Sequence, residues 1–200
     1  MTTQPAQRGP AQSGTPQSGP AQSGTPQLGR YTIDPERSRV GFATRHLFGL
    51  PVRGSFAIRS GTVDVTEPAA RSSVRVEIDA ASFDTGNQAR DKNVRSGRFL
   101  DADRYPTMRF TADRLDDSTL AGMLTVRGVS RPVTVTLEEV TRQDGTRQDG
   151  TRGEAPTADH ASFAARATTR IDRTDFGVTA SRGLAGRYLT VTLDIRCVRQ

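Results

Sequence analysis

The tripeptide Asp84-Thr85-Gly86 suggests chemistry most directly, because the same three residues carry the catalytic carboxylate in aspartic proteases. That mechanism needs two carboxylates that share one proton, so the second would have to come from a partner chain. The charged run 87–91 follows the tripeptide directly, where a protease needs a tight loop supported by apolar residues. The sequence therefore disfavours a protease.

Few side chains could bind a metal or act as a nucleophile. His46 and His160 are the only histidines, and Cys197 is the only cysteine. A zinc site usually takes several His or Cys ligands, which these residues cannot supply without carboxylates. The chain also has no Gly-x-Ser-x-Gly motif and no phosphate-binding glycine loop. We therefore expect no metal and no cofactor. His46 is more simply a hydrogen-bonded histidine at the mouth of the barrel, and the leading enzyme alternative would use it as a base.

Cys197 has no second cysteine to pair with, and its place in an apolar alternation predicts a buried structural thiol.

Residues 1–28 contain no apolar run of the ~7–15 residues that a secretory signal needs. No run in the chain reaches the ~20 apolar residues that span a bilayer. We expect a cytoplasmic protein without stable membrane insertion.

The first 29 residues differ in composition from the rest of the chain. Gly, Pro, Ser, Thr and Gln dominate there, and the segment 11–17 recurs as 21–27. Such a stretch has too little apolar surface to fold, so we expect a disordered tail at 1–29 and one domain at 30–200. The net charge is +6, but the arginines are scattered among 22 acidic residues, which does not favour nucleic-acid binding.

From residue 30 onward, apolar and polar residues alternate with a period of two, which is typical of half-buried antiparallel strands. The inward-facing sets are Tyr31 and Ile33; Val40, Phe42 and Thr44; Val52, Gly54, Phe56 and Ile58; Val63 and Val65; Val74, Val76 and Ile78; Met108, Phe110 and Ala112; Leu120, Gly122, Leu124 and Val126; Val133, Val135 and Leu137; Phe163, Ala165, Ala167, Thr169 and Ile171; and Leu189, Val191, Leu193, Ile195 and Cys197. About eight strands with short turns predict a mainly β fold, either a sandwich or a closed barrel.

Two segments interrupt the alternation. Residues 87–103 predict a short helical segment, with Asn87 or Thr85 as its cap. The run Thr-Arg-Gln-Asp-Gly is duplicated within 141–159, and its Asp-Gly pairs predict a mobile hairpin tip.

Several motifs occur in a specific order. They are Tyr31 to Phe42; Arg45-His46 and then Val52-Arg53-Gly54-Ser55-Phe56; Asp84-Thr85-Gly86-Asn87 with Arg90-Asp91 and Arg95-Ser96; Phe99-Leu100-Asp101; Tyr105-Pro106 with Phe110; Leu120 to Val133; and Arg173-Thr174-Asp175-Phe176-Gly177. Together they resemble the YceI-like polyisoprenoid-binding family over residues 30–198. The sequence departs from that family at Asn93, where a histidine is usual, and in the duplicated tip.

The resemblance implies an extended, lipocalin-like antiparallel β-barrel of about eight strands with a helical segment over it. It also implies a cavity for a long apolar molecule, an isoprenoid or a fatty-acid-type lipid, and a carrier rather than an enzyme. Small inward residues favour such a cavity, namely Gly54, Ala112, Gly122, Ala165 and Ala167. The same residues could instead make room for large phenylalanine rings opposite them.

We expect the ligand to contact Phe42, His46, Phe56, Arg90, Arg95, Phe99, Phe110, Leu124, Phe163 and Phe176. Arg90, Arg95 and Arg173 could hold a charged head group, or each could form an ion pair with a nearby aspartate. Two alternatives stay open: an enzyme that acts on an isoprenoid-like substrate with His46 as base, and a stress-related interaction module with a filled barrel. Two copies could also pair through an exposed barrel edge.

Overall fold

The computed structural model describes residues 22–24, 26–45, 49, 51–143, 161–181 and 185–200. Most of the expected tail (1–21 of 1–29) and of the expected hairpin tip (144–159 of 141–159) therefore lies outside the described residues. Residues 22–24 and 26–28 lie against one end of the barrel, where Tyr31 donates a hydrogen bond to the carbonyl of Gln27 (2.9 Å). None of the described helices is both long enough and apolar enough to cross a bilayer.

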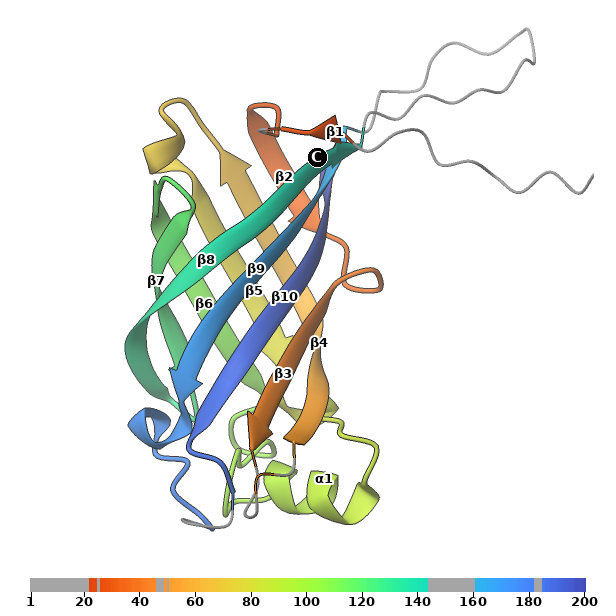
Figure 1. The fold of residues 1–200 in the computed structure, drawn as a ribbon, viewed down its shortest axis with the longest axis vertical. Helices are drawn as coiled ribbons and strands as arrows, with labels where there is room; N and C mark the ends of the chain where they lie inside the picture. Colours follow the sequence, from red (N-terminus) through yellow and green to blue (C-terminus); the bar gives the residue numbers. More distant parts are fainter. Residues whose placement is uncertain (1–21, 25, 46–48, 50, 144–160, 182–184) are drawn as a thin grey trace, which may run out of the picture.

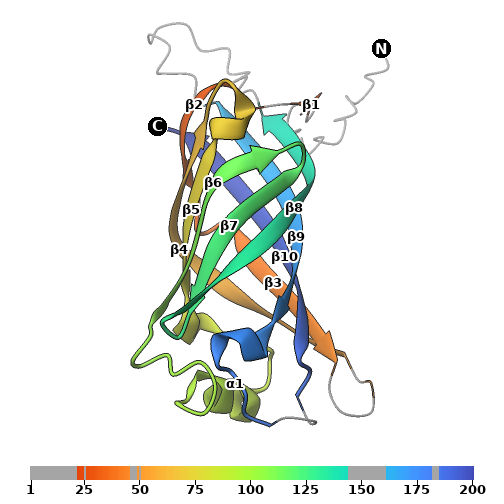
Figure 2. The same cartoon turned by 90° about the vertical axis from the view of Figure 1, so that its left-hand side faces the viewer.

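The domain is a closed antiparallel β-barrel, as predicted (Figures 1 and 2). The strands are β1 (Gln22–Ser23), β2 (Gly29–Ile33), β3 (Arg39–Arg45), β4 (Pro51–Val65), β5 (Ser73–Asp79), β6 (Thr107–Asp116), β7 (Thr119–Val126), β8 (Val129–Gln143), β9 (Ser162–Asp172) and β10 (Tyr188–Arg199). Strands β4 to β10 follow one another around the wall. Strands β2 and β3 close it, because both pair with β4 on one side and with β10 on the other.

Strands β2 and β3 occupy one position in the wall and are separated by a short break at 34–38. The Asp34 carboxylate accepts hydrogen bonds from the backbone N–H groups of Glu36 (3.0 Å) and Arg37 (3.3 Å). The Ser38 hydroxyl accepts one from the N–H of Arg196 in β10 (2.9 Å). These side chains replace the ladder bonds that the break removes. The barrel thus has eight positions around its wall, as the sequence predicted.

A bulge in β4 explains why its inward residues change phase. The inward residues are even-numbered up to Ile58 and odd-numbered from Val63. The pairing with β5 shifts register between Ile58 and Ser60. One extra residue in a strand moves every later side chain to the opposite face, so the bulge returns Val63 and Val65 to the interior.

The two ends of the barrel are covered differently. Helix α1 (Gln88–Arg95) and the 3-10 helix η4 (Arg173–Phe176) lie at one end, which we call the α1 end (Figure 1). The Asn87 side chain caps α1 by accepting a hydrogen bond from the Arg90 N–H (3.0 Å), which confirms the predicted helical segment. The 3-10 helix η2 (Ala69–Arg71) lies at the opposite end, the η2 end; η3 (Ala80–Ser82) follows β5.

The inward side chains form the core that the alternation predicts. Buried members include Ile33, Val40, Phe42, Ile58, Val76, Ile78, Met108, Phe110, Leu120, Val135, Phe163 and Ala167. Tyr31 and Cys197 are only 1% exposed, so the prediction of a buried thiol is confirmed.

Candidate ligand-binding cavity

A cavity of about 590 Å³ runs along the inside of the barrel. Each of the strands β3 to β10 contributes to its wall, which extends from Phe99 and Phe176 at the α1 end to Thr66 and Ala69 at the η2 end. Its volume falls within the range of about 300–1,000 Å³ typical of small-molecule sites. The interior is therefore not filled by side chains, which rules out the filled barrel in this structure.

Two glycines in the wall allow phenylalanine rings to lie close to the sheet. A Cβ added to Gly54 would come within 2.6 Å of the Phe42 ring, and one added to Gly122 within 2.7 Å of the Phe110 ring. Both rings line the cavity. Because each ring occupies the space of the missing side chain, it takes less room from the cavity.

The small inward residues therefore do both things considered from the sequence: some make room for phenylalanine rings, and others leave space for the cavity. Gly54 and Gly122 accommodate rings, and Ala112 is buried at the wall. Ala165 and Ala167 line the cavity directly and keep its diameter large.

Aromatic side chains gather inside the barrel in two places. Phe42, Phe56 and Phe83 form a cluster with ring centroids 5.2–5.6 Å apart. Tyr31 and Phe163 pack edge to face, with centroids 4.9 Å apart, in the half nearer the η2 end. Such packing holds the rings in position, and the four phenylalanine rings border the cavity, so its wall is preformed there.

Several polar groups along the cavity already have hydrogen-bond partners. Thr44 donates to the carbonyl of Tyr188 (2.8 Å), and Thr169 donates to the carbonyl of Thr134 (2.7 Å). The hydroxyl of Ser72 accepts from the Thr66 N–H (3.1 Å). Within the described ranges, no buried side-chain nitrogen or oxygen lacks a partner. An apolar ligand would therefore leave Thr44, Thr169 and Ser72 with the hydrogen bonds that they already make.

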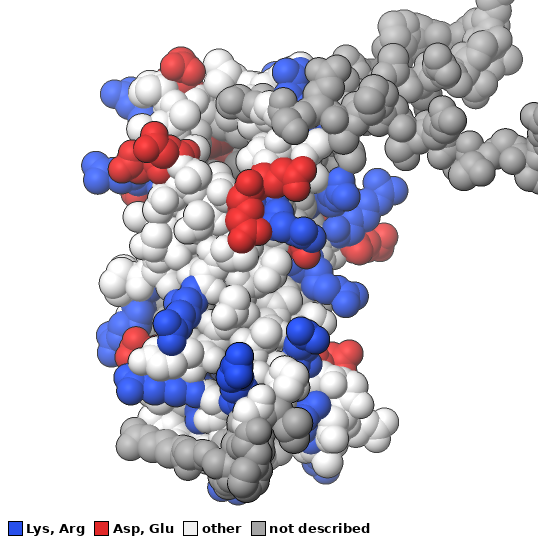
Figure 3. Space-filling model, viewed as in Figure 1, with Lys and Arg blue, Asp and Glu red and all other residues white. Residues whose placement is uncertain are grey.

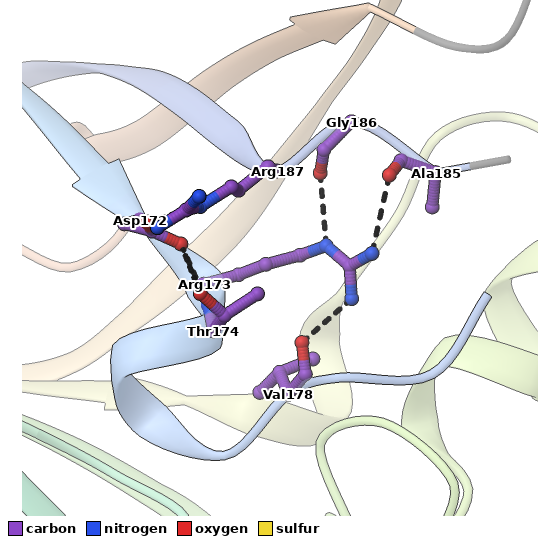
Figure 4. Close-up of polar contacts among 7 residues, drawn as sticks. All are labelled: Asp172, Arg173, Thr174, Val178, Ala185, Gly186 and Arg187. Atoms are coloured by element: carbon purple, nitrogen blue, oxygen red, sulfur yellow. Dashed lines mark hydrogen bonds and ion pairs between the residues drawn. The ribbon is translucent and has the colours of Figure 1, made fainter. Parts of the chain in front are cut away.

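Arg173 organises the backbone that covers the α1 end (Figure 4). Its guanidinium donates to the carbonyls of Gly186 (2.8 Å), Val178 (2.6 Å), Ala180 (2.9 Å) and Ala185 (3.1 Å). The side chain also borders the cavity. Its position on four carbonyls gives it a structural role in this cover, beside the head-group role considered from the sequence.

Asp172, the residue before Arg173, supports the start of η4. Its carboxylate accepts from the N–H (2.9 Å) and hydroxyl (2.6 Å) of Thr174 and pairs with the Arg187 guanidinium (2.6 Å). Burial raises the Asp172 pKa, but these hydrogen bonds and the arginine outweigh burial and hold that pKa below its usual value.

The tripeptide Asp84-Thr85-Gly86 attaches α1 to the barrel. Asp84 bridges to Ser55 of β4 through two backbone hydrogen bonds (2.9 and 3.0 Å). The buried Asp91 carboxylate accepts hydrogen bonds from the N–H and hydroxyl of Thr85. Burial raises the Asp91 pKa, but the hydrogen bonds from Thr85 outweigh it, so the pKa lies below its usual value.

Arg90 and Arg95 hold the same segment from α1. The Arg90 guanidinium donates to the hydroxyl (2.6 Å) and carbonyl (3.2 Å) of Thr85 and also borders the cavity. The Arg95 guanidinium donates twice to the Phe83 carbonyl and does not line the cavity. Arg90 is therefore better placed than Arg95 to meet a ligand.

The structure brings most of the predicted site residues to one cavity. Those that line it are Phe42, Phe56, Arg90, Phe99, Phe110, Leu124, Phe163 and Phe176. Arg95 lies outside the lining, and His46 lies outside the described residues. That these side chains contact a ligand stays a prediction.

Sequence reasoning missed several aliphatic lining residues, because it selected aromatic anchors. Val94, Met108 and Val126 border the cavity, as do Glu67 and Asp117 at the η2 end. The alternation marks Met108 and Val126 as inward, but Glu67 and Asp117 lie in turns, where no periodicity exists. Among the described residues, no three His, Cys, Asp or Glu side chains are grouped as a metal site would require.

Comparison with known proteins agrees with this architecture. Residues 31–198 match the family model of the YceI-like domain. A UPF0312 protein of Pseudomonas aeruginosa is 30% identical over 179 residues, covering 85% of this chain and 87% of that protein. A UPF0312 protein of Vibrio vulnificus is 32% identical over 157 residues, covering 74% of this chain and 77% of that protein.

Two solved structures share the fold. Burkholderia cenocepacia BcnA superposes with a TM-score of 0.62 at 20% identity, covering 82% of this chain and 98% of that one. A polyisoprenoid binding domain from Saccharophagus degradans superposes with a TM-score of 0.61 at 14% identity, covering 87% of this chain and 100% of that one. At these identities the likeness establishes the fold alone.

Proposed function

The chain belongs to the YceI-like domain family, and from that premise we propose that it binds a long apolar molecule of isoprenoid or fatty-acid type along the barrel axis. The observation that carries the proposal is the cavity of about 590 Å³ inside a closed barrel wall. Most of its lining side chains are apolar, so its surface is suited to hydrocarbon. The polyisoprenoid binding domain of Saccharophagus degradans has the same fold, which supports this class of ligand.

Burial of hydrocarbon supplies enough free energy for such binding. Each buried CH₂ group contributes about 0.8 kcal/mol, so a chain of about twenty carbons gains roughly 16 kcal/mol before costs. Ordering the chain and losing its rigid-body freedom return a large part of this gain. Tight binding therefore needs no strong polar contact.

We further propose that the protein carries or sequesters this molecule without transforming it. The hydrogen bonds of Thr44, Thr169 and Arg173 engage their polar groups within the protein. The alternative is an enzyme with His46 as base, and turnover of an isoprenoid-like substrate that is lost in His46→Ala would favour it. A cytoplasmic location and pairing of two copies stay predictions.

Native mass spectrometry of protein purified from its own host tests the proposal. We expect an additional mass from a bound lipid, released under organic solvent. A matched pair of variants shows whether the lipid lies in the cavity. Ala165 lines the cavity, whereas Ala164, the preceding residue on β9, does not.

We expect Ala165→Phe to lose the lipid and Ala164→Phe to keep it, with both variants folded by circular dichroism. A clean apo mass for the wild-type protein, or equal retention of lipid by both folded variants, would contradict binding in the cavity.

A further inference from the structure

The outer wall at the α1 end carries exposed arginines around an exposed tyrosine. We call this the Arg–Tyr patch, and it consists of Arg45, Arg53, Arg170, Arg187 and Tyr188, all exposed. The cross-strand register brings its members together, because Arg53 of β4 and Arg170 of β9 lie in one row across β3 and β10. Figure 3 shows basic side chains over the lower part of this face and most acidic ones higher up.

The patch has a net positive charge and a defined geometry. The guanidinium carbons of Arg170 and Arg187 lie 4.1 and 5.2 Å from the centre of the Tyr188 ring. Asp172, in the register position opposite Tyr188, pairs with Arg187. Asp175 also acts on Arg187, and exposed Asp84 bridges to Ser55 beside the patch, so the four arginines still exceed the three nearby carboxylates. The next row toward the η2 end, which includes Gly41 and Thr192, is uncharged.

The same strand ends that carry the patch also form the wall of the cavity. Thr44, Gly186 and Leu189 line the cavity, and each is a sequence neighbour of a patch residue. Side chains on a strand alternate between faces, so these segments present arginine and tyrosine outside and the cavity wall inside. A surface bound to the patch is therefore brought close to the α1 end of the cavity.

We propose that the Arg–Tyr patch binds the surface of an anionic lipid bilayer. Basic side chains are attracted to anionic lipid, and tyrosine suits the boundary between head groups and acyl chains. Docking there would place the cavity beside a source of apolar molecules. A single-stranded nucleic acid is less well matched, because its bases stack on several aromatic side chains and the patch offers one. Docking requires no bound ligand, so a failure to dock would leave the proposed ligand binding intact. A failure to bind a ligand would likewise leave the proposed docking intact.

Vesicle sedimentation with the full chain tests the proposal. The vesicles contain phosphatidylglycerol and phosphatidylcholine in equal parts, or phosphatidylcholine alone. The patch variant is Arg53→Gln with Arg170→Gln. The matched control is Arg71→Gln with Arg114→Gln, which removes the same charge from exposed positions toward the η2 end.

At about 1 kcal/mol per basic residue near an anionic surface, we expect the patch variant to lose about 30-fold in partitioning to the anionic vesicles. The control variant should bind as the wild type does, and neutral vesicles should bind neither. Equal losses in both variants would show attraction by net charge alone and would overturn the proposal, as would no binding by the wild type. Binding of single-stranded RNA, lost in the patch variant, together with no vesicle binding would assign the patch to nucleic acid instead.

A fluorescent reporter tests the contact itself. The chain contains no tryptophan, so Tyr188→Trp places a single reporter in the patch. Met123→Trp places one on an exposed position of β7 as a control. We expect anionic vesicles to shift the emission of Tyr188→Trp to the blue and to leave Met123→Trp unchanged. A shift confined to Met123→Trp, or none in either variant, would overturn the proposal.

Discussion

Phe110 of β6 lies against Gly122 of β7, with ring atoms 2.7 Å from the point where a side chain on Gly122 would begin. Gly122 pairs with Ala112 across the strands, whereas Phe110 pairs with Leu124. The Phe110 ring therefore extends along the sheet from its own pair to the space above Gly122. Gly122→Ala should push the ring into the cavity, weaken binding of long-chain ligands and destabilise the fold by about 1–3 kcal/mol through overpacking. Urea unfolding and ligand titration measure the two effects.

Gly97→Ala is the control for that prediction, because its added Cβ would meet Asp101 at an ordinary 3.6 Å. It should change stability by less than about 0.5 kcal/mol. If Gly122→Ala binds a long-chain ligand as tightly as Gly97→Ala does, Phe110 does not limit the cavity.

Arg90 and Arg95 provide a test of head-group recognition. Arg90 borders the cavity, whereas Arg95 donates to the Phe83 carbonyl from outside it. We expect Arg90→Gln to weaken binding of a fatty acid about tenfold, the equivalent of 1.4 kcal/mol, and to leave the fatty alcohol of equal chain length nearly unchanged. Arg95→Ala should lower stability and change both affinities alike. A selective loss of the fatty acid in Arg95→Ala would restore the role first predicted for it.

Phe110→Asp should abolish uptake of both fatty molecules, because an unpaired carboxylate in the cavity is not compensated by hydrogen bonds. Isothermal titration of the folded variant measures the loss. Leu124→Gln places an amide on the adjacent cavity position and serves where Phe110→Asp does not fold. Unchanged uptake by either folded variant would contradict the cavity as the binding site.

Asp91 should make the protein less stable in acid. Its pKa is lower folded than unfolded, so its stabilising effect is complete above the unfolded value of about 3.9 and is lost as the pH falls through the folded pKa. Asp91→Asn should cost about 1–3 kcal/mol near neutral pH and flatten the decline below about pH 4. Urea unfolding across this range measures both, and a slope unchanged from wild type would contradict the assignment. The pKa of Asp172 is also lowered in the folded protein, so Asp91→Asn should still lose some stability as the pH falls.

Cys197 should be almost inert in the folded protein. Burial raises the pKa of its thiol to about 12. At about pH 8 its thiolate fraction is roughly a thousand-fold below that of an exposed thiol, before restricted access is counted. Labelling with a thiol reagent should follow the rate of unfolding. Ser60→Cys in a Cys197→Ser chain supplies the exposed control, and labelling of the native wild type as fast as this control would contradict the burial of Cys197.

The barrel could be predicted because its wall obeys a simple period. The alternation placed Val40, Phe42 and Met108 inside, and the structure confirms each position. The sequence shows that the inward-facing residues of β4 change from even-numbered to odd-numbered. Only the pairing of β4 with β5 identifies the cause, which is the bulge between Ile58 and Ser60.

The ends of the barrel could not be predicted in the same way. The hydrogen bonds described for Arg90, Arg95 and Arg173 go to backbone carbonyls and a threonine hydroxyl. Every residue offers a carbonyl, so no side-chain pattern marks which one an arginine will reach. The Arg–Tyr patch likewise combines residues from four strands, β3, β4, β9 and β10, and depends on their register.

Among the strands that the structure describes, the wall has no open seam, since β2 and β3 together connect β4 with β10. A guest molecule must therefore travel lengthwise and pass one of the two ends, rather than slip sideways between parted strands. How firmly the guest is held and how quickly it is exchanged then depend on different residues. Substitutions midway along the cavity should change the affinity for the ligand and therefore its residence time. Substitutions around Arg173 should change the rates of loading and release together.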